Sequence, residues 1–183
     1  MTQNYDVIVI GSGPGGEGAA MKLAKSGKRV AVVEEKAAVG GNCTHRTTIP
    51  SKALRQGIQQ MVDSGNYTNA NYQHLLQSAE QVIRQQVDLR SSFYERNLIE
   101  VLQGRGAFVD AHTVQVTAPS GATKEYTAAH FIIATGARPY HPADIDFSNP
   151  HIQDSDTILT YERNPRSITI YGAGVIGCEY ASI

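Results

Sequence analysis

The sequence predicts an α/β fold in which helices cover a mostly parallel sheet, with a second unit of the same kind begun near the carboxyl end. Residues 7–10 are a continuous apolar run that ends at a glycine, which is typical of a strand buried on both faces of a parallel sheet. Helical and strand-like patterns then alternate along the chain. A second strand-to-glycine transition follows at residues 167–172.

The amino-terminal part has the pattern of a strand, a helix and a second parallel strand. We expect the helix to begin at about Gly15 and to stop at Gly27, before a buried strand at residues 29–34. Residues 35–49 are rich in glycine and polar residues and predict a loop. Pro50 can then occupy the first turn of another helix.

The middle of the chain predicts one long helix followed by short strands. Apolar residues recur at helical spacing from about 72 to 97, which indicates an amphipathic helix that covers one face of the sheet. Residues 131–134 predict another buried strand, and the proline-bearing stretch 139–165 predicts a linker with one short helical turn. A small antiparallel meander is expected from the β-like runs at 101–103, 107–109, 113–117 and 125–126.

Composition narrows the class of protein. The chain has 183 residues and a net charge of -1, so it carries no large single-sign field that would attract nucleic acid or anionic lipid. No apolar run approaches the roughly 20 residues of a membrane span, and residues 1–6 lack the features of a secretory signal. We therefore expect a cytoplasmic protein with no nucleic-acid or membrane partner. Cys43 and Cys178 are expected to be free thiols, and His45 has no partner at metal-ligand spacing.

Residues 11–16, GSGPGG, fit the dinucleotide fingerprint G-x-G-x-x-G, directly after a predicted strand and at a helix start. Gly11 permits the tight turn, Gly13 lets the backbone approach a pyrophosphate, and Gly16 lets the helix pack on the strand. The alternative is a tight turn followed by a surface acid. The predicted dinucleotide-binding residues of this Rossmann-like unit are Gly11, Gly13, Gly15, Gly16 and, after the second strand, Glu34, Glu35 and Lys36, with Glu34 placed to accept hydrogen bonds from an adenosine ribose.

Residues 172–177, GAGVIG, repeat the fingerprint after the second predicted strand. Gly172, Gly174 and Gly177 are predicted to bind a second dinucleotide, unless the match is due to chance. Two such motifs suit hydride transfer between a bound flavin and an exchanged nicotinamide. The residue that selects NAD or NADP is expected after a strand that this chain does not contain, so nucleotide preference stays open.

Residues 40–54, GGNCTHRTTIPSKAL, resemble the redox-active segment of the flavoprotein disulfide reductases. In that family two cysteines separated by four residues precede an Ile-Pro-Ser-Lys stretch, whereas here the first is Cys43 and the second position holds Thr48. Without a second sulfur no intramolecular dithiol can form. The soluble pyridine nucleotide transhydrogenases have a similar segment that also lacks the second cysteine. The chain resembles them further at residues 11–21, 93–97, 138–142 and 171–183. Arg46 and Thr47 differ from the residues expected in that group.

The resemblance implies a Rossmann-like FAD-binding domain at 1–150, incomplete here, and the start of a Rossmann-like NAD(P)-binding domain in 151–183. It implies an oxidoreductase that transfers hydride between NADPH and NAD+ through bound FAD, with NADH and NADPH as exchanged substrates and a homo-oligomeric full-length protein. It also implies that Lys52 approaches the flavin and pairs with Glu179 as the catalytic pair. Further FAD contacts are implied for Gly40, Gly41, Asn42, Cys43, Gly106, Ala107, Thr135 and Gly136.

Other interpretations stay open from the residues themselves. The protein could be a flavin-dependent reductase of a quinone or oxygen, although no acceptor pocket in the sequence favours it. The 183 residues alone could form a non-catalytic flavin-binding fragment. A lysine such as Lys52 is more often a solvated surface charge, and Cys43 is either a reactive thiol beside His45 and Arg46 or a packed side chain.

Overall fold

The computed structural model describes residues 3–65, 72–161 and 165–183. The chain divides into two compact units, each assembled from two separate segments. Unit 1 comprises Met1–Asn42 and Gln86–Gly136, and unit 2 comprises Cys43–Gln85 and Ala137–Ile183. The boundary expected near residue 150, between an FAD-binding domain and a second domain, stays a prediction.

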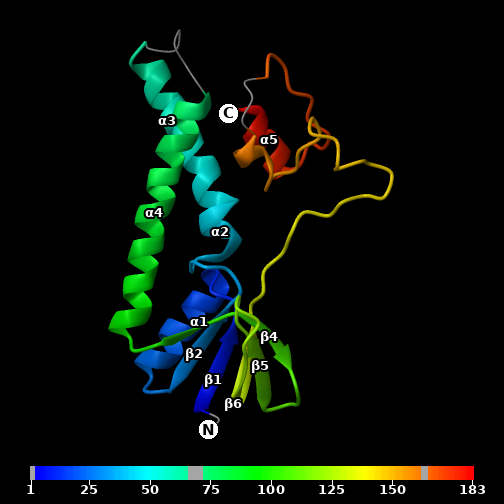
Figure 1. Ribbon diagram of the computed structural model, residues 1–183. Helices are drawn as coiled ribbons and strands as arrows, with labels where there is room; N and C mark the ends of the chain where they lie inside the picture. Colours follow the sequence, from blue (N-terminus) through cyan, green and yellow to red (C-terminus); the bar gives the residue numbers. More distant parts are fainter. Residues whose placement is uncertain (1–2, 66–71, 162–164) are drawn as a thin grey trace. The chain divides into compact units, whose positions relative to one another are not determined.

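Unit 1 is built on one six-stranded sheet with the strand order β3-β2-β1-β6-β5-β4 (Figure 1). Its first three strands along the order are parallel, and β6 is parallel to β1 on one side and antiparallel to β5 on the other. The sheet therefore joins a parallel half to an antiparallel half through β6. The strands are β1 Gln3–Ile10, β2 Val30–Glu34, β3 Glu100–Gln103, β4 Arg105–Phe108, β5 Thr113–Thr117 and β6 Thr123–Ile133.

The two faces of this sheet bury different sets of side chains, as the alternation along β1 requires. Ile8 packs with Val33 and Val114, so the antiparallel strands contribute to the core on one face. Val9 on the other face packs with Ala20 of α1, which spans Pro14–Lys25, and with Tyr94 of α4. The expected α/β class is confirmed. Of the long helix expected over one face, only the part that belongs to unit 1 packs on this face, through Tyr94.

The strands after α4 differ from the sequence-based expectation in two ways. β3 was expected in an antiparallel meander but pairs in parallel with β2 at the sheet edge. The run at 125–126 and all but the last residue of the run at 131–134 belong to one strand, β6. This strand ends at Ile133, which is 68% exposed rather than buried. The local sequence pattern could not predict the pairing of β3, because strands distant in sequence decide it. It could not predict the exposure of Ile133 either, because the end of β6 pairs on one side only, with β1.

Unit 2 contains a pair of packed helices, α3 Thr48–Asp63 and the first half of α4, which spans Tyr72–Arg96. Leu54 of α3 and Leu75 and Ala79 of α4 form their buried contact. The loop predicted over 35–49 is wrong in part, because α2 occupies Gly41–His45 and α3 begins at Thr48. Burial of Thr44 and Pro50 stabilises helix here against a composition that favours a loop.

The carboxyl-terminal segment of unit 2 has little regular structure. Within 137–161 a single 3-10 turn, η2 Ile158–Thr160, matches the expected helical turn, and residues 162–164 lie outside the described part. Residues 167–171 were expected to form a strand but are exposed and pair with no strand of the described residues, so they lack the ladder that defines one. The helix α5 follows at Val175–Ala181. None of the described helices is long and apolar enough to cross a bilayer.

Candidate functional site

The turn between β1 and α1 packs so tightly that two of its glycines are required by the chain itself. Gly11 has φ +103°, and a Cβ on it would lie 2.4 Å from the carbonyl oxygen of Ala134. A Cβ on Gly16 would lie 1.9 Å from the carbonyl oxygen of Gly11. No other residue fits either position without backbone movement.

Gly13 differs from these two glycines, because the chain leaves room for a side chain there. Its φ of -63° suits any residue, and an added Cβ would meet only the Cα of Gly41, at 4.0 Å. Gly13 is also the N-cap of α1, where no side chain caps the helix, and an added Cβ on Gly15 would meet nothing within 4 Å. The helix start thus offers amide groups beside open space, which suits an anion.

Ser12 is a site residue that the motif-based prediction missed, since it occupies a variable position of the fingerprint. Ser12 is fully buried; its backbone N–H donates to the Glu34 carboxylate at 3.0 Å, and its hydroxyl donates to the same oxygen. The hydroxyl oxygen also accepts the N–H of Gly40 at 3.0 Å. One serine therefore ties together the glycine turn, the end of β2 and the start of the next loop.

Glu34 keeps hydrogen-bonding capacity beyond these contacts. Its second oxygen accepts the backbone N–H of Lys36 at 2.8 Å, so three donors reach a carboxylate that offers about four lone-pair positions. Glu34 is 6% exposed, whereas Glu35 and Lys36 are exposed. The carboxylate is thus held rigidly and can accept one further hydroxyl donor.

The segment after β2 returns to the glycine turn. Gly41 has φ +59°, and a Cβ on it would lie 2.8 Å from the Cα of Gly13, so the two backbones touch. Asn42 and Cys43 follow in the short helix α2, where Cys43 is half-buried and its sulfur is free. Thr48, in the position of the second cysteine, is the first residue of α3.

The remaining predicted FAD contacts of unit 1 lie in two places. Thr135 and Gly136 are exposed directly after β6, and Gly136 has φ +77°. Gly106 lies on β4, where an added Cβ would be 3.3 Å from Val33 Cγ1, so a side chain there would require Val33 to shift slightly. Ala107 is exposed beside it.

Unit 2 brings Lys52 of α3 and Glu179 of α5 together, with the Lys52 Nζ 3.2 Å from the Glu179 Oε1. The Lys52 side chain is 64% exposed and that of Glu179 is 23% exposed. The second glycine motif, which leads into α5, repeats the geometry of the first. Gly172 has φ +122°, and a Cβ on Gly177 would lie 2.2 Å from the carbonyl oxygen of Gly172. Gly174 is the N-cap of α5.

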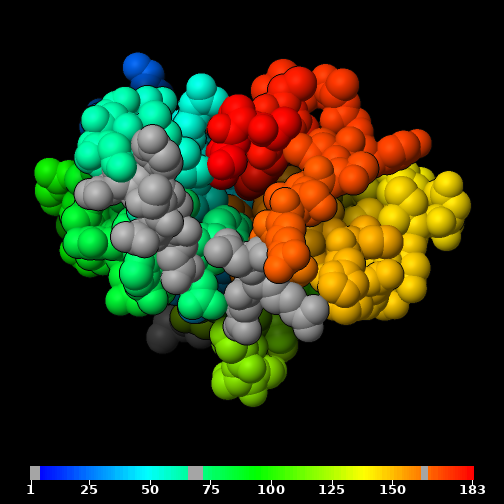
Figure 2. All heavy atoms as spheres, turned by 90° about the horizontal axis from the view of Figure 1, so that it is seen from above, coloured from blue at the N-terminus to red at the C-terminus, as the bar shows by residue number. Residues whose placement is uncertain are grey.

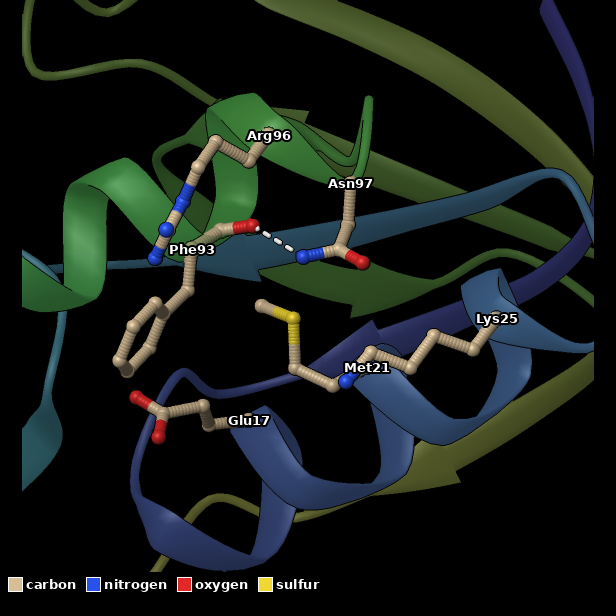
Figure 3. Close-up of a pocket in the computed structure, with 6 residues that line it drawn as sticks. All are labelled: Glu17, Met21, Lys25, Phe93, Arg96 and Asn97. Atoms are coloured by element: carbon tan, nitrogen blue, oxygen red, sulfur yellow. Dashed lines mark hydrogen bonds between the residues drawn. The ribbon is translucent and has the colours of Figure 1, made fainter.

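A cavity of about 450 Å³ lies between α1 and the end of α4, and its lining contains none of the predicted site residues (Figure 3). The lining residues are Glu17, Met21, Lys25, Phe93, Arg96 and Asn97. Among residues 3–65, 72–161 and 165–183, no group of three or more His, Cys, Asp or Glu side chains could hold a metal ion.

Comparison with known proteins identifies the family of this chain. A family described as pyridine nucleotide-disulphide oxidoreductase matches residues 5–183. The chain belongs to this family. Two curated relatives, both called soluble pyridine nucleotide transhydrogenase, come from Pseudomonas putida, at 52% identity, and from Escherichia coli O9:H4, at 53% identity. Each alignment covers 98% of this chain but only 41% of the relative, so the chain spans less than half of their length.

Solved structures share the fold. The HOCl-induced flavoprotein disulfide reductase RclA from Escherichia coli, in its Cu(II) complex, superimposes with a TM-score of 0.86 at 28% identity. That match covers 99% of this chain and 40% of the reductase chain. A second structure of the same reductase gives a TM-score of 0.83, also at 28% identity.

Proposed function

We propose that the protein to which this chain belongs is an FAD-dependent transhydrogenase that passes hydride between NADPH and NAD+. One observation carries the proposal. The segment that holds two cysteines in the flavoprotein disulfide reductases keeps Cys43 but has Thr48 at the second position, in a chain with two glycine motifs of the same geometry. The names of the two relatives support the same conclusion.

The residues of unit 1 fit a dinucleotide with a pyrophosphate. The open space at Gly13 and Gly15 lies at the uncapped start of the 12-residue helix α1, where a phosphate would receive backbone N–H groups. Glu34 has capacity left for a ribose hydroxyl. FAD, when bound, supplies a ring that accepts hydride from one nicotinamide and returns it to another.

The roles of the other residues follow from this proposal. Lys52 would place a cation at the flavin and so stabilise the negative charge of its reduced form, while Glu179 holds that cation. Contacts to the flavin or to its adenine are proposed for Gly40, Gly41, Asn42, Cys43, Gly106, Ala107, Thr135 and Gly136, and contacts to NAD(P) for Gly172, Gly174 and Gly177. The homo-oligomer, the cytoplasmic location and the boundary near residue 150 stay predictions.

Lack of a second sulfur limits what the site can do. Disulfide reduction by thiol–disulfide exchange needs a pair of cysteines that alternates between dithiol and disulfide. Cys43 and Cys178 are both free in the structure, and Thr48 cannot complete a pair. Electrons that reach the flavin would therefore leave directly from it, and hydride transfer to a second nicotinamide is the route proposed here.

The test is NADPH-dependent reduction of an NAD analogue by the full-length polypeptide loaded with FAD. Lipoamide and glutathione disulfide serve as control acceptors, and a quinone and oxygen are the competing acceptors. Rapid reduction of the analogue with inert disulfides supports the proposal. Turnover with disulfides, or turnover with quinone that far exceeds that with the analogue, contradicts it.

A further inference from the structure

Within unit 2, a seam of polar contacts joins α3 to α5. Besides the Lys52–Glu179 pair, the Arg55 Nη1 donates to the Ser182 Oγ at 2.7 Å, and the Ser51 Oγ donates to the Glu179 Oε1 at 3.1 Å. Figure 2 shows the red atoms of the carboxyl end against the cyan atoms of α3. The seam therefore connects the helix of the Ile-Pro-Ser-Lys segment with the helix of the second glycine motif.

Ser51 is the buried member of this seam. Ser51 is 3% exposed, in contrast to Lys52 next to it. Both reach the same oxygen, because the Lys52 Nζ lies 3.2 Å and the Ser51 Oγ 3.1 Å from the Glu179 Oε1. Two adjacent residues of one helix thus hold one carboxylate oxygen from two directions.

The ion pair by itself cannot fix the carboxylate. A solvent-exposed lysine gives a weak pair and pays side-chain entropy for each fixed geometry. A serine hydroxyl on a packed helix has few rotamers, and a hydrogen bond to an ionised oxygen is among the stronger kinds. Ser51 therefore fixes the orientation of the Glu179 carboxylate, which the flexible lysine cannot do.

We propose that Ser51 is a positioning residue, which holds the Glu179 Oε1 in place so that the carboxylate in turn holds the Lys52 ammonium. This inference rests on the proposed function, in which Lys52 serves the flavin. Ser51 does not touch the flavin in this account and acts only through Glu179. The competing interpretation is a local hydrogen bond within α3, because the Ser51 Oγ also lies 3.3 Å from the Thr48 carbonyl oxygen, a common contact for serine in a helix.

The two interpretations differ in what a Ser51→Ala variant of the full-length, FAD-loaded protein does. If Ser51 acts through Glu179, the rate constant for flavin reduction at saturating NADPH falls about 10-fold, the loss expected for a hydrogen bond to a charged group, with little change in KM. Ser51→Thr, which keeps the hydroxyl, restores most of the rate. Ser182→Ala removes the Arg55 contact of the seam and a hydrogen bond to the Glu179 backbone carbonyl, but no contact to the Glu179 carboxylate. It is the matched control and keeps the wild-type rate.

A double-mutant cycle decides between them. In a Glu179→Gln background, Ser51→Ala should change the rate less than about 2-fold, because the group through which Ser51 acts is already altered. A second cycle on the urea midpoint of the FAD-free full-length protein should show coupling between the two positions. Ser51→Cys, a weak donor of similar size, replaces Ser51→Ala if that variant does not fold.

A purely local role of Ser51, in its hydrogen bond to the Thr48 carbonyl, gives a different result. Ser51→Ala then lowers the urea midpoint equally in both backgrounds and leaves the reduction rate unchanged, which overturns the inference. Failure of the wild-type protein to pass hydride to an NAD analogue would instead contradict the proposed function, and the cycle on the FAD-free protein would still test the contact between Ser51 and Glu179.

Discussion

The buried hydroxyl of Ser12 donates to the carboxylate of Glu34, across 22 positions of sequence. The Ser12 backbone N–H donates to the same oxygen, so the glycine turn and the end of β2 are locked to each other. These hydrogen bonds hold the acid at the end of β2 beside the glycine motif without any contribution from a ligand. They also mean that the protein alone orients the Glu34 carboxylate, and this would lower the entropy cost of the proposed ribose contact.

Ser12→Ala tests this lock. We expect the free energy of unfolding to fall by about 1–3 kcal/mol, because the buried carboxylate and the Gly40 N–H each lose a partner. FAD retention on gel filtration should weaken as well. Ser26→Ala removes an exposed hydroxyl bond on the last turn of α1 and should change neither quantity. Equal stability of the two variants in urea unfolding would contradict the lock.

Gly13→Ala tests whether glycine is required at this position for FAD binding and not for stability of the fold. Because an added Cβ meets only the Gly41 Cα at 4.0 Å, the FAD-free protein should unfold at the wild-type urea concentration. The methyl group would still occupy the space beside the α1 amides, and we expect FAD affinity to fall by about 10-fold or more. Gly18→Ala, where an added Cβ meets nothing within 4 Å, should leave FAD affinity unchanged. Normal FAD binding by Gly13→Ala would place the pyrophosphate elsewhere.

The bidentate pair between Arg90 of α4 and Glu17 of α1 should stabilise unit 1. The Arg90 Nη1 lies 2.8 Å from both Glu17 oxygens, and the two side chains are only 17% and 16% exposed. Arg90→Ala should lower the free energy of unfolding by about 1.5–3 kcal/mol, since it leaves a half-buried carboxylate unpaired. Arg84→Ala breaks an exposed pair with Glu80 on the same helix and should have no measurable effect. Similar unfolding midpoints for both variants would show that burial does not matter here.

Asp154 should make part of the stability depend on pH. Burial acts to raise the pKa of Asp154, but hydrogen bonds from His141 and from the Thr157 and Asp156 amides outweigh it, so its pKa is lowered. The stabilisation is thus complete above the ordinary aspartate pKa of about 3.9 and is lost as pH falls through the lower pKa of the folded state. Asp154→Asn should lower Tm at pH 7, and the difference from wild type should shrink below about pH 4.

The exposed Asp144 on the same segment supplies the control for that experiment. Asp144→Asn should give the wild-type Tm at both pH values. A Tm difference between wild type and Asp154→Asn that stays constant from pH 7 to pH 3 would mean that the carboxylate charge of Asp154 is not the stabilising feature.

Strong local signals were sufficient to predict much of unit 1 from sequence. The apolar runs of β1 and β2, the glycine turn and the periodicity of α4 each depend on residues close together in the chain, and the structure confirms these elements. Strand pairing was harder to predict, because the sequence of β3 fits a parallel edge strand as well as a strand of an antiparallel meander. Residues 167–171 show the same limit: they have a strand pattern, but a strand forms only where another strand pairs with it.

The candidate site was predicted unevenly for a related reason. Gly11 and Gly16 were identified because their packing demands glycine, and the structure shows that demand. Ser12 and Ser51 were not singled out, because serine is common and its role appears only once a distant carboxylate is in place. Sequence reasoning thus found residues constrained by the backbone and missed those constrained by a partner.

We expect FAD to be the only redox-active group at this site, because Thr48 stands where a second cysteine would complete a dithiol. An anaerobic titration of the full-length, FAD-loaded protein with dithionite, followed by the flavin absorbance, tests it most directly. We expect reduction to be complete at two electrons per FAD. Uptake of four electrons per FAD would reveal a redox-active disulfide and contradict the account.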